Sequence, residues 1–154
     1  MQKKIFLLLI FLLLSSCGYE AIYSKKNSIN YNFSISELNF AGDRDINVKM
    51  KERLKNYTLS KKNKNYKIKI SSTSTKTIVA KDTADNATSF KNTVTINVEI
   101  STNDKLKNSF VMSESFNFNN NSNKFSLKRY EREIKNNLAE TLSEKLIFKL
   151  SNIQ

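Results

Sequence analysis

Apolar and polar residues alternate along four stretches of the chain, and this two-residue period predicts strands. The first runs from Tyr31 towards Phe40, and the second runs from Tyr66 through a serine and threonine tract, which favours strands, to Ala80. The last two keep one parity, apart from Glu114, in Phe90, Val94, Ile96, Val98, Ile100, Phe110, Met112, Phe116 and Phe118. With a loop at residues 81–89 and a turn at Asn103 and Asp104, the last three strands form an antiparallel meander with one apolar face.

A short amphipathic helix is predicted between the first two strands. Gly42 ends the first strand, and Asp43 or Asp45 can cap a helix and place negative charge at its positive end. The apolar residues that follow, at helical spacing, are Ile46, Met50, Leu54 and Tyr57. This spacing puts them on one helical face, with lysines and arginine elsewhere.

The final element is predicted as a helix over residues 126–151, with Ser126 as its cap, after a flexible loop at residues 119–123. Its apolar stripe recurs every four residues, in Tyr130, Ile134, Leu138, Leu142, Leu146 and Leu150, and Leu127, Ala139 and Ile147 widen it. A steady spacing of four favours packing on the sheet over a coiled-coil seam, in which spacings of three and four alternate.

These elements predict an α+β fold, with two helices packed on one face of a roughly four-stranded, mainly antiparallel sheet. The opposite face of the sheet should be rich in lysine, serine, threonine and asparagine. It is therefore free to meet water or a polar partner.

The N-terminal residues read as a secretory signal. Lys3 and Lys4 precede an apolar run from Ile5 to Leu14, which is shorter than the roughly 18 residues of a membrane span. The run ends in two serines and Cys17, an order that resembles the bacterial lipobox, in which the cysteine is acylated and becomes the first mature residue. Cys17 is the only cysteine in the chain, and acylation would remove an unpaired thiol from an oxidising compartment. An ordinary signal peptide followed by a chance cysteine is the alternative.

The sequence therefore divides into a removed signal peptide over residues 1–16, a lipidated N-terminus and tether over residues 17–30, and a single α+β domain over residues 31–154. Because the signal carries two lysines and no acid, its removal lowers the net charge from +12 to +10. The length of the domain allows a modest core.

The composition argues against an enzyme. The chain has no histidine and two glycines, which leaves no imidazole base, no ordinary zinc site and no glycine-rich phosphate loop. Asp43 with Asp45 and Asp82 with Asp85 lack metal-ligand spacing and are interpreted as helix-start and loop residues. No cofactor or metal is predicted, and no serine and lysine stand out as a catalytic pair.

The positive charge suits an anionic partner. Nucleotide bias towards lysine and asparagine accounts for part of it. Export and lipidation argue against nucleic acid, and the chain has no nucleic-acid-binding motif. Phosphate-bearing lipid is the better anion for a protein tethered to a membrane, because ammonium groups pair with phosphates.

Several features together resemble the LPS-assembly lipoprotein family, LptE. They are the lipobox with Gly18 and Tyr19 after the cysteine, the strand and helix that open the domain, the stretch Ala80 to Ala84 at a strand end, and the meander closed by a long helix. The resemblance covers nearly the whole chain, although its motifs are short.

The resemblance implies a non-enzymatic lipoprotein on the periplasmic side of the outer membrane, and Gly18 in place of an aspartate is consistent with that sorting. Family members sit as a plug in the β-barrel LptD, help it assemble and bind lipopolysaccharide. In the family, basic residues near the loop between the second and third strands and near the start of the last helix contact the lipid. The corresponding candidates here are Lys81, Lys91, Lys124 and Lys128, although the familiar arginine has no certain counterpart.

Two other functions stay open at this point. One is a periplasmic lipoprotein that pilots a different envelope complex, such as a secretin, and needs no lipid ligand. The other is a lipid-anchored hydrolase that uses a serine and lysine pair, which an active-site serine reagent would label.

Overall fold

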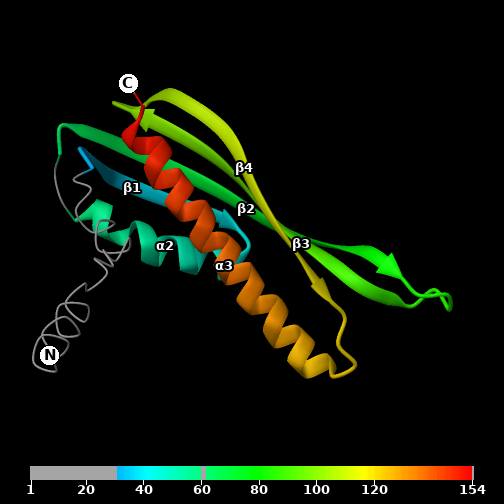
Figure 1. The fold of residues 1–154 in the computed structure, drawn as a ribbon. Coiled ribbons are helices and arrows are strands. Elements are labelled where there is room, and N and C mark those ends of the chain that lie inside the picture. The colour runs from blue at the N-terminus through cyan, green and yellow to red at the C-terminus, as the bar shows by residue number, and fades with distance from the viewer. Residues whose placement is uncertain (1–30, 60–61, 154) are drawn as a thin grey trace, which may run out of the picture. The chain divides into compact units, whose positions relative to one another are not determined.

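A computed structural model of the chain describes residues 31–59 and 62–153, and all of its elements belong to the unit Asn32–Gln154. They are β1 (Phe33–Gly42), α2 (Arg44–Thr58), β2 (Lys64–Lys81), β3 (Ala87–Thr102), β4 (Lys105–Asn119) and α3 (Lys124–Ser151). The four strands form one sheet in the order β1-β2-β3-β4, and α2 and α3 lie along the same face of it (Figure 1). The predicted α+β fold is confirmed.

The sheet is mixed in direction. β2, β3 and β4 form the predicted antiparallel meander, and α2 connects β1 to β2, which run parallel. Asn103 and Asp104 turn the chain between β3 and β4 with positive φ angles of 49° and 60°. Two positive φ angles in a two-residue turn match the twist of the flanking strands, so the predicted turn is also confirmed.

The core lies between the sheet and the two helices. Even-numbered residues of β2 from Tyr66 to Ser72 and of β3 from Asn92 to Ile100 face the helices and are buried, whereas the odd-numbered lysines, serines, threonines and asparagines form the uncovered face. The buried strand residues are Tyr66, Ile68, Ile70, Val94, Ile96, Val98 and Ile100. Burying one large apolar side chain of this kind contributes about 1.5–3 kcal/mol, so this layer dominates stability.

A bulge in β1 corrects the parity of its apolar residues. Ile35 lies opposite Tyr66, but Leu38 lies opposite Ile68, because the register shifts between Ile35 and Glu37. One extra residue in a strand turns the following side chains to the other face. The odd-numbered apolar residues before the bulge and the even-numbered ones after it therefore both face the helices.

Glu114, the exception in the pattern of β4, faces the helices and pairs with Lys145 of α3. Lys149, one turn further along α3, places its ammonium group 3.7 Å from the centre of the Phe110 ring. These two contacts hold the C-terminal part of α3 over β4.

The loop between β2 and β3 is shorter than predicted. It spans residues 82–86, because the Asp82 carboxylate accepts hydrogen bonds from the backbone N–H groups of Ala84 and Asn86, both at 2.9 Å, and Asp85 adopts a φ of 66°. The Asn86 backbone hydrogen bond is the main reason why the pKa of Asp82 lies below its ordinary value. The loop prediction for residues 81–89 was wrong, since local hydrogen bonds let both strands continue.

Asp43 caps α2, as one of the two predictions had it, and its carboxylate accepts from the backbone N–H groups of Asp45 and Ile46 at 3.0 and 3.3 Å. Gly42, the last residue of β1, has a φ of +92°, and a Cβ there would lie 2.0 Å from the backbone oxygen of Ser72. Both the dihedral and the close approach require glycine.

α3 begins two residues earlier than predicted. Its cap is Asn123, whose side chain accepts from the N–H of Ser126, so the prediction of Ser126 as the cap was wrong. The predicted buried stripe is confirmed from Ile134 to Leu150 but not at Tyr130, which is 43% exposed. Steps of four residues rotate by about 40° each on a helix, which carries the first member of the stripe away from the core. Among the described residues, no helix combines the length and apolar character of a membrane span.

Candidate functional site

The first ten residues of α3, Lys124 to Glu133, include no buried side chain, and Ile134 is the first that enters the core. This segment lies beside the end of β4 and borders a cavity on each of its flanks. We call these cavities the aromatic groove and the basic pocket.

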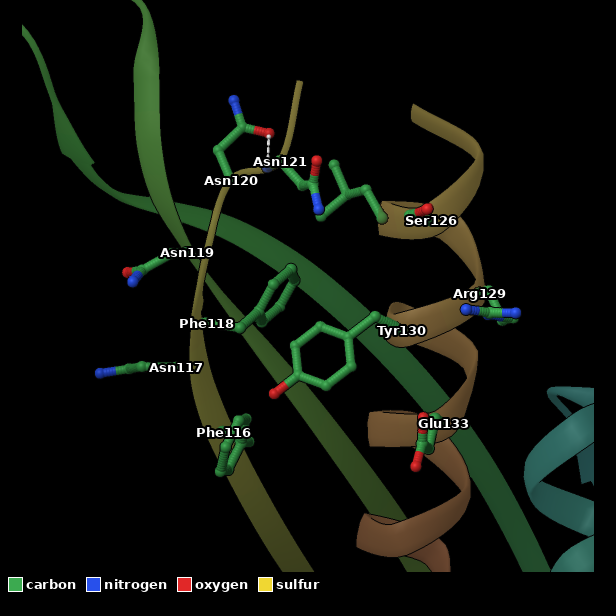
Figure 2. Close-up of a pocket in the computed structure, with 11 residues that line it drawn as sticks. Phe116, Asn117, Phe118, Asn119, Asn120, Asn121, Ser126, Arg129, Tyr130 and Glu133 are labelled. Atoms are coloured by element: carbon green, nitrogen blue, oxygen red, sulfur yellow. Dashed lines mark hydrogen bonds between the residues drawn. The ribbon is translucent and has the colours of Figure 1, made fainter. Parts of the chain in front are cut away.

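The aromatic groove has a volume of about 580 Å³ and lies between the end of β4 and the first turns of α3 (Figure 2). Phe116, Phe118 and Tyr130 point toward one another across it (Figure 2). Phe118 and Tyr130 meet edge to face, with ring centres 6.0 Å apart and an interplanar angle of 86°. Phe116 is 47% exposed, so the groove presents aromatic surface to an incoming apolar group.

Polar groups occupy the margins of the aromatic groove. Asn120 and Asn121 line it from the loop before α3, and Ser126, Arg129 and Glu133 line it from the helix (Figure 2). Asn120 is held in place, because its side chain donates to the backbone oxygen of Ala87 at 2.7 Å. A ligand in this groove would need an apolar body with polar groups at its ends.

A second hollow of about 210 Å³ adjoins the groove and shares Phe116, Tyr130 and Glu133 with it. It follows the flank of α3 past Asn137 to Thr141. Apolar and small polar side chains therefore border this helix for more than three turns beside β4.

The basic pocket, of about 300 Å³, lies on the other flank of α3, towards the start of α2. Four cations and three carboxylates line it, namely Lys76, Lys128, Arg132, Lys135, Asp43, Asp45 and Glu131. Lys76 pairs with Glu131, and Lys135 pairs with Asp43 at 2.9 Å. Lys128 and Arg132, one helical turn apart, make no ion pair within the described part of the chain, and the pocket as a whole carries one net positive charge.

Asp43 and Lys135 fix the wall of the basic pocket. Burial raises the pKa of Asp43, but hydrogen bonds from Lys135 and from the backbone of Ile46, with the charge of Lys135, outweigh it, and the pKa is lowered. Asp43 is therefore ionised at neutral pH and neutralises Lys135. This ion pair stabilises the fold, so only the other cations of the pocket are available to bind an anion.

Lys76 links the two cavities. Its ammonium group lies 3.9 Å from the centre of the Phe90 ring and 5.7 Å from that of Phe118, while it also pairs with Glu131. Phe118 belongs to the wall of the aromatic groove. Aromatic surface and positive charge thus share one layer beneath the first turns of α3.

The structure brings together only part of the predicted lipid-binding set. Lys128 lines the basic pocket, and Lys124 is the first residue of α3, one turn before it. Lys81 lies at the tip of the β2–β3 hairpin and pairs with Asp85 at 2.8 Å, and Lys91 is exposed on β3 opposite Thr77 and Asn117. Cys17 lies outside the described residues.

Sequence reasoning missed Arg132 and Lys76, which complete the basic pocket, and the three rings of the aromatic groove. Arg132 follows Lys128 by four residues, a spacing that puts two side chains on one helical face and could have identified it. No pattern in the neighbouring sequence identifies Lys76, because its position in the pocket depends on how α3 crosses the sheet.

No protein-family model matches the chain, and no curated protein matches it by sequence. Several solved structures share its fold. Rare lipoprotein B from Shewanella oneidensis matches with a TM-score of 0.55 and 8% identity over 75% of this chain and 97% of that one. A minor lipoprotein from Acinetobacter baumannii matches with a TM-score of 0.57 and 13% identity, over 79% and 91%. For lipoprotein B from Nitrosomonas europaea the TM-score is 0.51 and the identity 9%, over 77% and 83%.

These structural neighbours are bacterial lipoproteins, and this chain resembles them in fold at a sequence identity of 8% to 13%. The matches cover more than four-fifths of each neighbour, so the likeness concerns whole domains and not a shared hairpin.

Proposed function

We propose that this protein is an LptE-like lipoprotein of the outer membrane, which binds lipopolysaccharide during transport and assists assembly of a β-barrel translocon. The observation that carries the proposal is the pairing of an aromatic groove on one flank of the first turns of α3 with Lys128 and Arg132 on the other flank. The lipobox at Cys17 and the fold shared with bacterial lipoproteins support it.

The two cavities suit the two chemistries of a phosphorylated glycolipid. Phosphate oxygens accept charge-assisted hydrogen bonds from lysine and arginine, which Lys128 and Arg132 can donate. Acyl chains gain free energy when they leave water, and Phe116 and Tyr130 offer exposed aromatic surface on the other flank of the helix. No residue in this arrangement needs to act as a nucleophile or a base, and we propose a binding protein and not an enzyme.

Binding of purified lipopolysaccharide tests the role of the basic pocket. The charge-reversal variant Lys128→Glu with Arg132→Glu should bind about tenfold or more weakly, because each lost charge-assisted hydrogen bond costs about 1.5–3 kcal/mol. The matched control is Lys51→Glu with Lys55→Glu, which changes the net charge equally at two exposed lysines of α2. Equal weakening by both pairs would reduce the effect to general charge and remove the pocket from the proposal.

The anchor is tested separately. Cys17→Ala should leave an unprocessed precursor or a soluble form, because acyl chains contribute about 0.8 kcal/mol per buried CH₂ to membrane attachment. Normal outer-membrane fractionation of that variant would contradict the lipid anchor.

Co-purification of a large β-barrel with the detergent-extracted protein would support the assembly role, and a clean monomer after crosslinking in cells would contradict it.

The second candidate is a lipoprotein that pilots another envelope complex. The broad polar face of the sheet, which neither α2 nor α3 covers, favours it as a surface for a protein partner (Figure 1). This function needs no lipid ligand, so failure of the wild-type protein to bind lipopolysaccharide would favour it.

A further inference from the structure

β4 is an edge strand. In the order β1-β2-β3-β4 one side of β4 pairs with β3, and no strand of the described chain pairs with the other. The strand is 15 residues long, well above the usual five or six. Its outer side therefore presents a long row of backbone N–H and C=O groups that can pair with another strand.

The other edge of the sheet is less open. β1 has 10 residues, a bulge between Ile35 and Glu37, and a charge at Glu37, and these features discourage pairing at an edge. β4 has no proline, and Glu114 is its one charged residue from Asn108 to Asn119. Lys145 neutralises that charge, and Lys67 lies 3.7 Å from Glu37 in the same way, so the edge of β4 differs from that of β1 in its greater length and in its regular register from Asn108 to Asn119.

On the side of the helices, a hollow beside β4 can take up side chains of an added strand. The hollow of about 210 Å³ between α3 and β4 is bordered by Phe116 and Thr141, and Phe148 of α3 is 67% exposed. Alternate side chains of an added strand would point towards α3, and the others would join the uncovered polar face beside Ser113 and Ser115.

We propose that the free edge of β4 binds an extended segment of another protein by β-strand addition, with alternate apolar side chains of that segment entering the hollow beneath α3. In this mode backbone hydrogen bonds supply affinity, and pockets for alternate side chains supply specificity. Binding at this edge does not involve Lys128 or Arg132, so strand addition and lipopolysaccharide binding are tested separately.

Charge identifies the kind of partner. The chain carries a net charge of +12, which opposes pairing between two copies. Lys105 and Lys107 open β4, and neither makes an ion pair within the described residues. The occupant is therefore a segment of a different protein in which apolar and small polar residues alternate and acidic residues lie beside these two lysines.

The test uses the full chain, extracted in detergent, and a synthetic peptide of about nine residues, a length suited to one strand. Phenylalanine and valine alternate with serine in this peptide, and glutamate stands at each end. At a peptide concentration of about ten times Kd, amide hydrogen exchange in β4 should slow about tenfold while exchange in β1 is unchanged. A control peptide, N-methylated at every amide, should not protect β4, because neither of its edges has an N–H group to donate.

A variant tests the hollow. Thr141→Arg fills it and should weaken peptide binding about tenfold, since entry of side chains is blocked. Thr58→Arg on α2 is the matched control, because both threonines are exposed and donate their hydroxyl hydrogen bond to a backbone oxygen of the preceding turn. Phe148→Ala, at another exposed position, should weaken binding several-fold and serves if Thr141→Arg does not fold.

Three results would overturn the proposal. They are equal protection by the N-methylated peptide, equal protection of β1 and β4, and absence of peptide binding by a chain that sediments as a dimer. The last result would make a second copy the occupant of the edge.

Discussion

The two parts of α3 belong to one helix but differ in burial: the second part packs in the core, and the first part does not. From Ile134 onward the helix buries eight side chains against the sheet and α2, while Lys124 to Glu133 bury none. The first part instead carries four basic and two acidic residues and borders both cavities. The second part therefore holds the helix in place, and this anchoring lets the first part present a site at little cost in stability.

The largest predicted effect lies in the anchored part. Leu142 is fully buried, and Leu142→Ala should lower the free energy of unfolding by about 2–5 kcal/mol, because it removes apolar contacts and leaves a cavity. Denaturant unfolding measures it. Lys128→Ala in the first part is the comparison and should change stability by less than about 0.5 kcal/mol. Equal losses would mean that the two parts of α3 are not distinct.

The second prediction concerns the contact that joins the start of α2 to α3. Asp43→Ala removes a helix cap and the partner of Lys135, and should cost about 1–2 kcal/mol. Because the pKa of Asp43 is lowered from 3.8 in the folded protein, its contribution is present above that pH and is lost as the pH falls through the folded value.

Unfolding of wild type and Asp43→Ala as a function of pH checks this sign. The difference between the two stabilities should be largest at neutral pH and should shrink as the pH falls below 3.8. Asp43→Asn separates the cap from the charge, since asparagine also caps helices but cannot pair with Lys135 as an anion. A difference between wild type and Asp43→Asn that is independent of pH would contradict the assigned role of the charge.

Local patterns predicted most of the fold. Ile46, Met50 and Leu54 are buried at the spacing that marked the first helix, and the even parity of Val94 to Ile100 identified the face of the sheet that meets the helices. These predictions succeeded because each depends on one helix or strand and the core it must face. The predictions of the Ser126 cap and the loop at residues 81–89 failed where side chains of asparagine and aspartate bind the backbone locally.

The candidate site could be predicted only in part, because it depends on contacts between distant segments. Lys135 and Asp43 are 92 residues apart, and no pattern in either segment specifies their pairing. Tyr130 looked like a member of the core stripe, and only the crossing of α3 over β4 places it against Phe118. Cys17 stays a sequence prediction, as it lies outside the described residues.

The third prediction tests the aromatic groove in the first part of α3. Tyr130→Ala removes a ring that is 43% exposed, so it should cost about 1 kcal/mol of stability or less. It should weaken lipopolysaccharide binding several-fold, through loss of aromatic surface for acyl chains. Tyr130→Phe, the control, keeps the ring and should bind normally. If Tyr130→Phe weakened binding as much as Tyr130→Ala, the effect would belong to the hydroxyl group, and this would contradict an apolar site.

The smallest predicted effect concerns the two lysines that lie outside the cavities. Lys81→Glu with Lys91→Glu should leave the fold intact, because exposed charges contribute little to stability. It should weaken lipopolysaccharide binding by about twofold to threefold, less than the change at Lys128 and Arg132, because neither lysine lines a cavity and the energy of charges beyond about 8–10 Å is screened at physiological salt. Raising the salt concentration should remove this effect before it removes that of the pocket variant. An effect as large as that of the pocket variant would place the lipid on the β2–β3 hairpin and shift the site away from α3.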